Sequence, residues 1–178
     1  KRVFSPGLAY AGNENTPVKI VGIDPDLESE TSRLADKVKQ GVYFNNQPND
    51  DGYFTAMIGV SAAASLQLNI GDELILISQG ADGSIANDIY IIGAIVGSRS
   101  SWDSATVYLP LNAAHDFLSL YGKSHQYALV LNDSADVIAA TQSIQALLPT
   151  FSVSPWMVVE ETFFKTMQAD KEGNLFGL

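Results

Sequence analysis

Residues 58–74 read IGVSAAASLQLNIGDEL and place a strand, a helix and a second strand in close succession. The triplet Ile58–Val60 is typical of a strand end, and the alanine-rich run Ser61–Leu68 predicts a helix. The turn signal Asn69–Asp72 ends that helix, because its glycine adopts a positive φ freely. The chain then enters a second strand, so this stretch indicates a fold that mixes helices and strands.

Downstream, the strands Glu73–Ser78 and Asp88–Val96 flank a glycine-rich turn, which predicts an antiparallel hairpin. Ala105–Leu109 is a short strand, and Pro110 suits the first turn of the helix that follows. The final third alternates between expected strands and helices: Tyr127–Leu131, Ser134–Leu148, Phe151–Val159 and Glu160–Ala169. That alternation predicts a strand–helix–strand crossover with parallel neighbours.

Upstream, Arg2–Ala11 and Pro17–Ile23 are strand-like runs on either side of a polar turn, and they predict another hairpin. A helix is expected next, capped by Asp26 or Ser29 and ending near Gln40. With a hairpin-rich middle and an alternating end, the predicted class is α+β, in two interleaved parts.

Composition excludes several classes of protein. The chain has 178 residues, of which 46% are hydrophobic and 17% charged, as expected for one folded domain or two small lobes. Its net charge of −10 argues against binding nucleic acid or an anionic membrane surface. The longest apolar run, Ile89–Gly97, has nine residues, whereas a membrane-spanning helix needs about 20. The absence of cysteine excludes disulfides, thiolate catalysis and cysteine-bound zinc.

The basic residues are unevenly distributed. No Lys or Arg occurs between Gln40 and Ser98, although that segment contains six acidic residues: Asp50, Asp51, Asp72, Glu73, Asp82 and Asp88. Part of the surface is therefore expected to be negative, either as a solvated face or as a face that attracts a basic partner.

Candidate catalytic residues are few. Ser61 follows an expected strand and begins an expected helix, and His115 and His125 are the two histidines of the chain. A hydrolase would need such a serine beside a histidine base, but no Gly-x-Ser-x-Gly pattern occurs. The competing interpretation of Ser61 is an ordinary N-terminal helix cap.

Metal and phosphate motifs are equally weak. Alternate acids occupy one turn in the manner of calcium ligands: Asp24, Asp26, Glu28 and Glu30. An EF-hand loop starting there requires glycine sixth and a bidentate acid twelfth, where this chain has Ser29 and Ala35. Acids at a helix N-terminus also complement the helix dipole without an ion. No phosphate-binding glycine motif is present. The residues predict a non-enzymatic domain without cofactor; a calcium- or carbohydrate-binding surface module, using these acids and Asp50–Asp51, stays the alternative.

The order of segments carries a family resemblance. Gly22–Glu28, Ile58–Leu74, Ile92–Ile95 and Val107–Ala114, in this succession, resemble the MacB-like periplasmic core domain. That domain occurs in FtsX-like permeases of ABC transporters, including the macrolide-exporter type and the LolC/LolE lipoprotein-releasing type. The resemblance extends from Arg2 to Leu178.

The resemblance implies two interleaved lobes. A Porter-like βαβ lobe would comprise residues 1–50 and 123–178, and a β-rich Sabre-like lobe, residues 51–122, would be inserted between them. The polar stretch Asn45–Gly52 and the turn Gly122–Ser124 lie where such an insertion would begin and end. The strand–helix portion that opens the family's domain is not found at Lys1, so we expect a piece of a longer protein.

The implied function is mechanical. Such a domain projects into the periplasm from an inner-membrane permease, catalyses nothing itself, and transmits the motion of a separate cytoplasmic ATPase to a substrate or partner. Implied partners are that ATPase, a second permease subunit in a homo- or heterodimer, and a periplasmic or outer-membrane protein or a lipoprotein. The tail Gly173–Phe176 resembles the lipoprotein-release type and favours lipoprotein release or transport over macrolide or peptide export. The resemblance also leaves open a role of the kind found in members that move no substrate and instead regulate cell-wall hydrolases.

Overall fold

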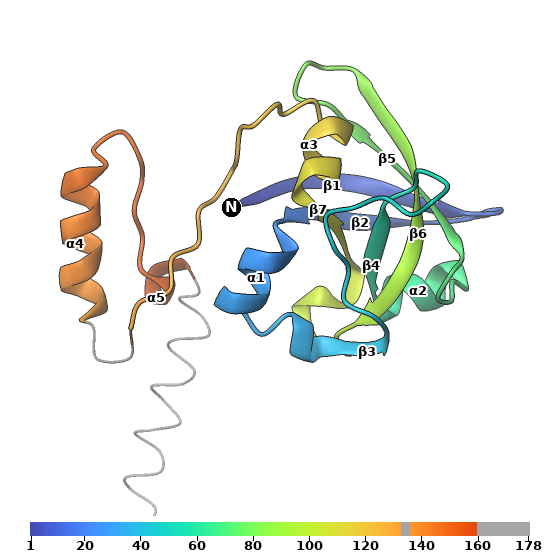
Figure 1. Ribbon diagram of the computed structural model, residues 1–178, viewed down its shortest axis with the longest axis horizontal. Coiled ribbons are helices and arrows are strands. Elements are labelled where there is room, and N and C mark those ends of the chain that lie inside the picture. Colours follow the sequence, from blue (N-terminus) through green and yellow to red (C-terminus); the bar gives the residue numbers. More distant parts are fainter. Residues whose placement is uncertain (133–135, 160–178) are drawn as a thin grey trace, which may run out of the picture. The chain divides into compact units, whose positions relative to one another are not determined.

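The computed structural model describes residues 1–132 and 136–159 (Figure 1). The chain divides into two compact units, Lys1–Leu129 and Val130–Leu178. The first unit contains a mixed β-barrel with short helices, and the described part of the second contains two helices. The predicted α+β class is therefore confirmed. Of the helices in the described residues, none has the length and hydropathy needed to cross a bilayer.

The first unit opens with the predicted hairpin. β1 (Arg2–Ala11) pairs antiparallel with β2 (Glu14–Ile23) along its whole length, with Arg2 opposite Ile23. The connecting turn consists of Gly12 and Asn13 alone, so it is tighter than the polar loop that the sequence predicts. This tight turn fixes the register of the longest strand pair in the unit.

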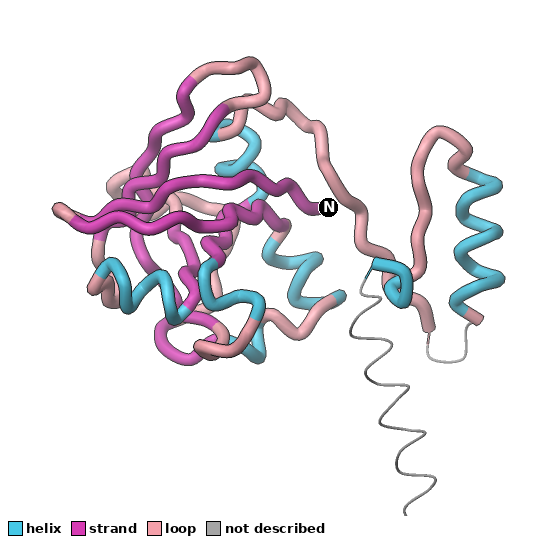
Figure 2. Tube along the Cα trace, turned by 180° about the vertical axis from the view of Figure 1, so that it is seen from behind, coloured by secondary structure: helices cyan, strands magenta, loops and turns pink. Residues whose placement is uncertain are grey.

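Six strands close into a barrel (Figures 1 and 2). The remaining four of them are β4 (Thr55–Gly59), β5 (Glu73–Gln79), β6 (Ile85–Val96) and β7 (Thr106–Pro110). Their order is β6-β4-β7-β2-β1-β5, and β5 pairs back onto β6, which confirms the predicted antiparallel hairpin. The pairs β2–β7 and β4–β6 are parallel. A short strand, β3 (Val38–Gly41), pairs with β6 outside this ring.

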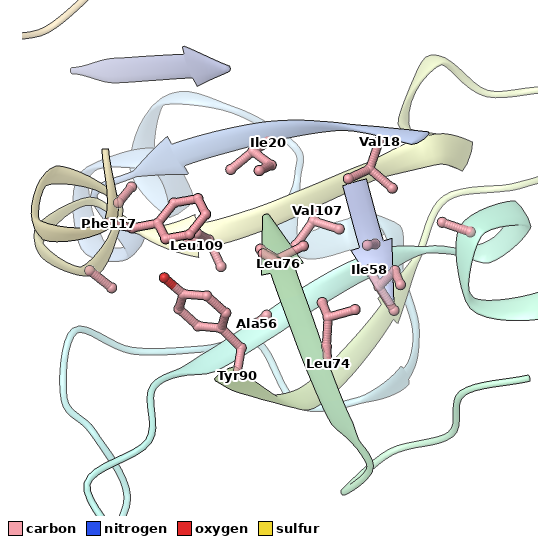
Figure 3. Packing of buried hydrophobic residues seen from close by; sticks show 14 of the residues in the cluster. Val18, Ile20, Ala56, Ile58, Leu74, Leu76, Tyr90, Val107, Leu109 and Phe117 are labelled. Atoms are coloured by element: carbon pink, nitrogen blue, oxygen red, sulfur yellow. The ribbon is translucent and has the colours of Figure 1, made fainter. Parts of the chain in front are cut away.

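Strands β2, β4 and β7 alternate their side chains between two buried clusters, because successive residues of a strand point to opposite faces. In β2, Val18 and Ile20 belong to the first cluster, whereas Val21 and Ile23 belong to the second. The first cluster is shown in Figure 3, where side chains from β2, β5, β6 and β7 converge. Two helices, α2 (Val60–Leu66) and α3 (Leu111–Phe117), contribute buried alanines and phenylalanine to it. The second half of β2, together with β4 and β7, is thus buried on both faces.

The predicted helix ending near Gln40 is wrong in length. Asp24 caps α1 (Pro25–Thr31), and the chain then forms a 3-10 turn, η1 (Ala35–Lys37), before entering β3. In the sequence, Leu27, Leu34 and Val38 are spaced by seven and four residues, as on one apolar stripe of a helix. In the structure Leu27 is exposed, whereas Leu34 belongs to the second cluster. Leu27 and Leu34 therefore belong to two separate segments and not to one helix, since α1 ends at Thr31.

The helix after β4 also ends earlier than predicted. α2 stops at Leu66, and Gln67 takes the left-handed conformation with φ of 55°. The backbone N–H of Gln67 is then satisfied by carbonyls of the last turn. Gly71 has a positive φ of 91°, but it shapes the following turn and does not end the helix.

The described part of the second unit contains α4 (Val137–Leu147), capped by Asp136, and α5 (Trp156–Val159). The predicted strands at 127–131 and 151–159 are wrong: the first forms no strand, and α5 occupies the end of the second. Apolar and β-branched runs form strands only where a partner strand pairs with them. The predicted crossover is therefore not found in the described residues, and the helix predicted at 160–169 lies outside them.

The lobe boundaries stay a prediction. Residues 1–50 provide β1 and β2 of the barrel and residues 51–122 provide β4 to β7, so both segments contribute to one sheet.

Candidate functional site

A polar cleft of about 400 Å³ opens on the first unit. Its walls come from β1, β2, α1, η1, β7 and a second 3-10 turn, η2 (Trp102–Ala105). The lining residues are Arg2, Phe4, Lys19, Val21, Ile23, Glu28, Ser32, Arg33, Leu34, Lys37, Trp102, Asp103, Thr106 and Tyr108. Apolar members of the second buried cluster thus lie among charged and aromatic side chains.

A bidentate ion pair forms one wall. Arg2 donates from Nη2 to Glu28 Oε1 at 2.6 Å and from Nε to Oε2 at 3.1 Å. The Glu28 side chain is only 8% exposed, and α1 holds it there because Asp24 caps the helix one turn earlier. Two parallel charge-assisted bonds fix the orientation of both groups. The first residues of β1 are therefore tied to α1.

A second network joins η1, η2 and β7. Lys37 Nζ lies 2.6 Å from Asp103 Oδ2, and the Tyr108 hydroxyl donates to Asp103 Oδ1. Burial by itself raises the pKa of Asp103, but the hydrogen bonds from Lys37 and Tyr108 outweigh it and lower the pKa below the ordinary value. Burial and the bond to Asp103 raise the pKa of Tyr108. The carboxylate is thus held ionised by its partners.

Lys19 and Trp102 complete the cleft. Lys19 Nζ lies 4.7 Å from the centre of the Phe4 ring, a cation–π contact. Trp102 is 92% exposed at the rim. Phe4 is held in turn by His125, whose Nδ1 accepts a hydrogen bond from the Phe4 backbone N–H at 2.9 Å. His125 therefore helps to hold Phe4 in place beside the cleft.

A second, mostly apolar depression of about 330 Å³ adjoins the cleft. It is lined by Phe4, Ser5, Pro6, Val18 and Lys19, so the two depressions share Phe4 and Lys19. The face of the β1–β2 hairpin therefore continues the surface of the cleft.

The arrangement suits recognition more than catalysis. The candidate nucleophile Ser61 lies in the first turn of α2. Its other interpretation, an N-terminal helix cap, is wrong, because Gly59 occupies the cap position. Within residues 1–132 and 136–159, Ser61 makes no side-chain hydrogen bond to His115 or His125. His115 lies in α3, with a buried Nε2 that has no hydrogen-bond partner among the described residues. The structure does not bring the hydrolase candidates together.

The acids proposed as calcium ligands have other roles. Asp24 caps α1, and Glu28 is bound by Arg2. In the part of the chain that the structure describes, no group of three or more metal-ligating side chains is positioned to hold an ion. The calcium alternative therefore finds no support in the geometry of these acids.

Between Gln40 and Ser98, the segment without Lys or Arg, two acidic side chains stabilise local turns. Asp72 accepts from the backbone N–H of Asn69 at 2.7 Å, and Asp82 accepts from the backbone and side chain of Ser84. The hydrogen bonds from Ser84 lower the pKa of Asp82. Whether this segment attracts a basic partner stays a prediction.

The cleft itself was missed by sequence reasoning. Its charged residues lie in β1, in β2, in the stretch 28–37 and in η2. The partners in each ion pair, such as Arg2 and Glu28, are far apart in the chain. No local motif marks such a site, because only the barrel topology brings these residues together. The one local signal was Trp102 in a polar bend.

Comparisons with known proteins agree with the fold. The family model for the MacB-like periplasmic core domain matches residues 1–147. Among solved structures, the chain is similar to the extracellular domain of the noncanonic ABC-type transporter YknZ from Gram-positive bacteria. That similarity has a TM-score of 0.54 and 16% identity, and it covers 83% of this chain and 74% of the other. A search of curated proteins finds no match.

Proposed function

Because the chain belongs to the family of MacB-like periplasmic core domains, we propose that it is the extracytoplasmic domain of an ABC transporter permease. In this role it catalyses nothing itself. It transmits the motion of a separate ATPase to a substrate or partner outside the cytoplasm. The observation that carries the proposal is the family match over residues 1–147.

The barrel is physically suited to that role. Six strands hydrogen-bonded in a closed ring leave no free edge along the ring, and close packing makes such a core resist deformation. A stiff body passes on a displacement applied at one end without absorbing it in internal rearrangement. Recognition surfaces such as the polar cleft would then move with it.

The finer assignments rest on the resemblance alone. We propose a cytoplasmic ATPase and a second permease subunit as partners, and a periplasmic location for the domain of an inner-membrane protein. A role in lipoprotein release or export rests on Gly173–Phe176, which lies outside the described residues. The Porter-like and Sabre-like division, with boundaries near residues 50 and 122, belongs to the same proposal.

Sequencing the gene on both sides of this segment is the first test. One apolar stretch of about 20 residues upstream and three downstream would give a four-helix permease with this domain in its first extracytoplasmic loop. Flanks with only a signal peptide and a polar tail would contradict the proposal.

Sidedness is tested by cysteine labelling, because the chain has no cysteine of its own. In the full-length protein, Ile85→Cys places a thiol at a residue that is 83% exposed. We expect a membrane-impermeant maleimide to label it in intact spheroplasts. The matched control Ile92→Cys, fully buried, should react only after denaturation. Labelling of Ile85→Cys that requires lysis of the spheroplasts would place the domain in the cytoplasm.

A further inference from the structure

The polar cleft has the opposite charge balance to the unit that carries it. Residues 1–129 contain fourteen acidic and eight basic residues. The cleft is nevertheless lined by four cations and two carboxylates: Arg2, Lys19, Arg33 and Lys37 against Glu28 and Asp103. A basic cleft in an acidic surface concentrates anions and repels cations.

The four cations are not equally available. Arg2 and Lys37 are bound to the buried carboxylates of the cleft, and Arg33 pairs with Asp36 at 3.0 Å on the surface. Among the described residues, no carboxylate lies within 4.0 Å of Lys19 Nζ. The Phe4 ring orders this ammonium group without neutralising its charge. Lys19 is therefore the cation of the cleft that is ready to accept an anion.

Apolar surface lies on both sides of this charge. Trp102 is 92% exposed on the cleft side, and tryptophan is one of the residue types enriched at binding hot spots. On the other side, the apolar depression shares Phe4 and Lys19 with the cleft. Two adjoining depressions, of about 400 and 330 Å³, offer more room than a small anion occupies.

We propose that the cleft and the adjoining depression bind an acidic peptide segment of a partner protein. A carboxylate of that segment accepts a hydrogen bond from Lys19 Nζ, and a neighbouring apolar side chain packs against Trp102. The pairs Arg2–Glu28 and Lys37–Asp103 hold the walls in place. The proposal does not depend on the transporter role, because the surface and its charge are properties of this unit alone.

The test uses the whole chain and a dye-labelled pentapeptide, Glu-Glu-Phe-Glu-Glu, blocked at both ends. Fluorescence anisotropy at low salt should show saturable binding, and the peptide Gln-Gln-Phe-Gln-Gln should bind at least about tenfold more weakly. Lys19→Gln should reduce affinity for the acidic peptide by about tenfold or more. Trp102→Ala should also weaken binding, and its exposed position makes misfolding a minor concern.

The matched control is Lys39→Gln, which removes the same charge from an exposed lysine of β3 outside the cleft. It should change affinity less than about twofold, with thermal melting confirming that every variant is folded. Equal losses in Lys39→Gln and Lys19→Gln would mean non-specific attraction and overturn the proposal. Absence of binding at about 1 mM protein would overturn it as well. Competition by free glutamate at equal carboxylate concentration would indicate a small-anion site and not a peptide site.

Discussion

Two carboxylates, Glu28 and Asp103, are buried in the walls of the cleft, and each is paired with one cation. A buried charge is tolerated only when it is paired and hydrogen-bonded. The cation of each pair keeps some access to water, since the side chains of Arg2 and Lys37 are 28% and 49% exposed. When a pair is broken, water can solvate the cation, so the cost in free energy comes mainly from the carboxylate that stays buried.

The first prediction concerns Glu28. Glu28→Gln removes the negative charge that Arg2 binds with two hydrogen bonds, and it should lower the free energy of unfolding by about 1–2 kcal/mol. Urea denaturation measures the change. Glu30→Gln alters an exposed residue of the same helix and should change stability by less than about 0.5 kcal/mol. Equal stability of the two variants would mean that the ion pair adds nothing.

The second prediction concerns Asp103 and pH. Its pKa is lowered in the folded chain, so its contribution to stability is complete above the ordinary carboxyl pKa and is lost as pH falls through the lower, folded value. Asp103→Asn should therefore be less stable than the unmodified chain at pH 7, and the difference should shrink below about pH 4.

Urea denaturation at pH 7, 5, 4 and 3 measures this difference. Asp51→Asn, at an exposed loop residue, is the control. Its difference in free energy of unfolding from the unmodified chain should not shrink as the pH falls. The contrary result is a free energy of unfolding of Asp103→Asn that lies below that of the unmodified chain by the same amount at every pH. That result would show that ionisation of Asp103 does not contribute to stability.

At the residue scale, sequence alone recognised Glu28 but not its role. Its position in an acidic turn suggested a calcium ligand or a helix-dipole contact, whereas its partner Arg2 lies 26 residues earlier. The pair exists because the β1–β2 hairpin returns the chain to the start of β1 before α1 begins. A contact of this kind follows from the strand topology, and the local sequence pattern around Glu28 does not show it.

At the scale of elements, the third prediction concerns the junction of β4 and α2. Gly59 has ordinary backbone angles, φ −66° and ψ 144°, so conformational freedom is not the reason for glycine there. A Cβ at Gly59 would instead collide with the backbone carbonyls of Asp103 and Ser104 in η2. Backbone atoms do not move aside cheaply, so Gly59→Ala should cost about 1–3 kcal/mol or more.

Urea or thermal unfolding measures this loss. Ser65→Ala, at an exposed position of α2, is the control and should lie within about 0.5 kcal/mol of the unmodified chain. Because η2 carries Trp102 and Asp103, Gly59→Ala should also disturb the cleft. A fully stable Gly59→Ala variant would contradict the close approach of Gly59, at the end of β4, to η2.

Local elements were predictable where turn chemistry and apolar runs agree. The hairpins β1–β2 and β5–β6 follow from glycine-containing turns between strand-like runs. The segment Tyr127–Leu131 has the same apolar character but forms no strand, and its neighbour Gln126 makes only an isolated bridge to Arg2. Strand formation depends on a partner, and a single sequence does not show which partners the topology leaves available.

At the scale of the whole molecule, closure of the barrel was the main feature that sequence did not reveal. Each hairpin is local, but the parallel pairs β2–β7 and β4–β6 join segments that are far apart in the chain. Together with the antiparallel pairs β4–β7 and β1–β5, they join the separate hairpins into one ring with two buried clusters. The α+β class was predictable from the mixture of elements, and the ring was not.

The last prediction compares the two units. No residue of α4 is buried, whereas all five residues of β7 are. Opening of a segment costs little free energy when it exposes little apolar surface. In hydrogen–deuterium exchange on the whole chain, amides of α4 should therefore exchange at least about a hundredfold faster than amides of β7. α3 is the matched control, since it is also a short helix but packs three buried residues against the barrel, and it should be protected more than α4. Exchange of α4 as slow as that of β7 would mean that the second unit has a stable core of its own.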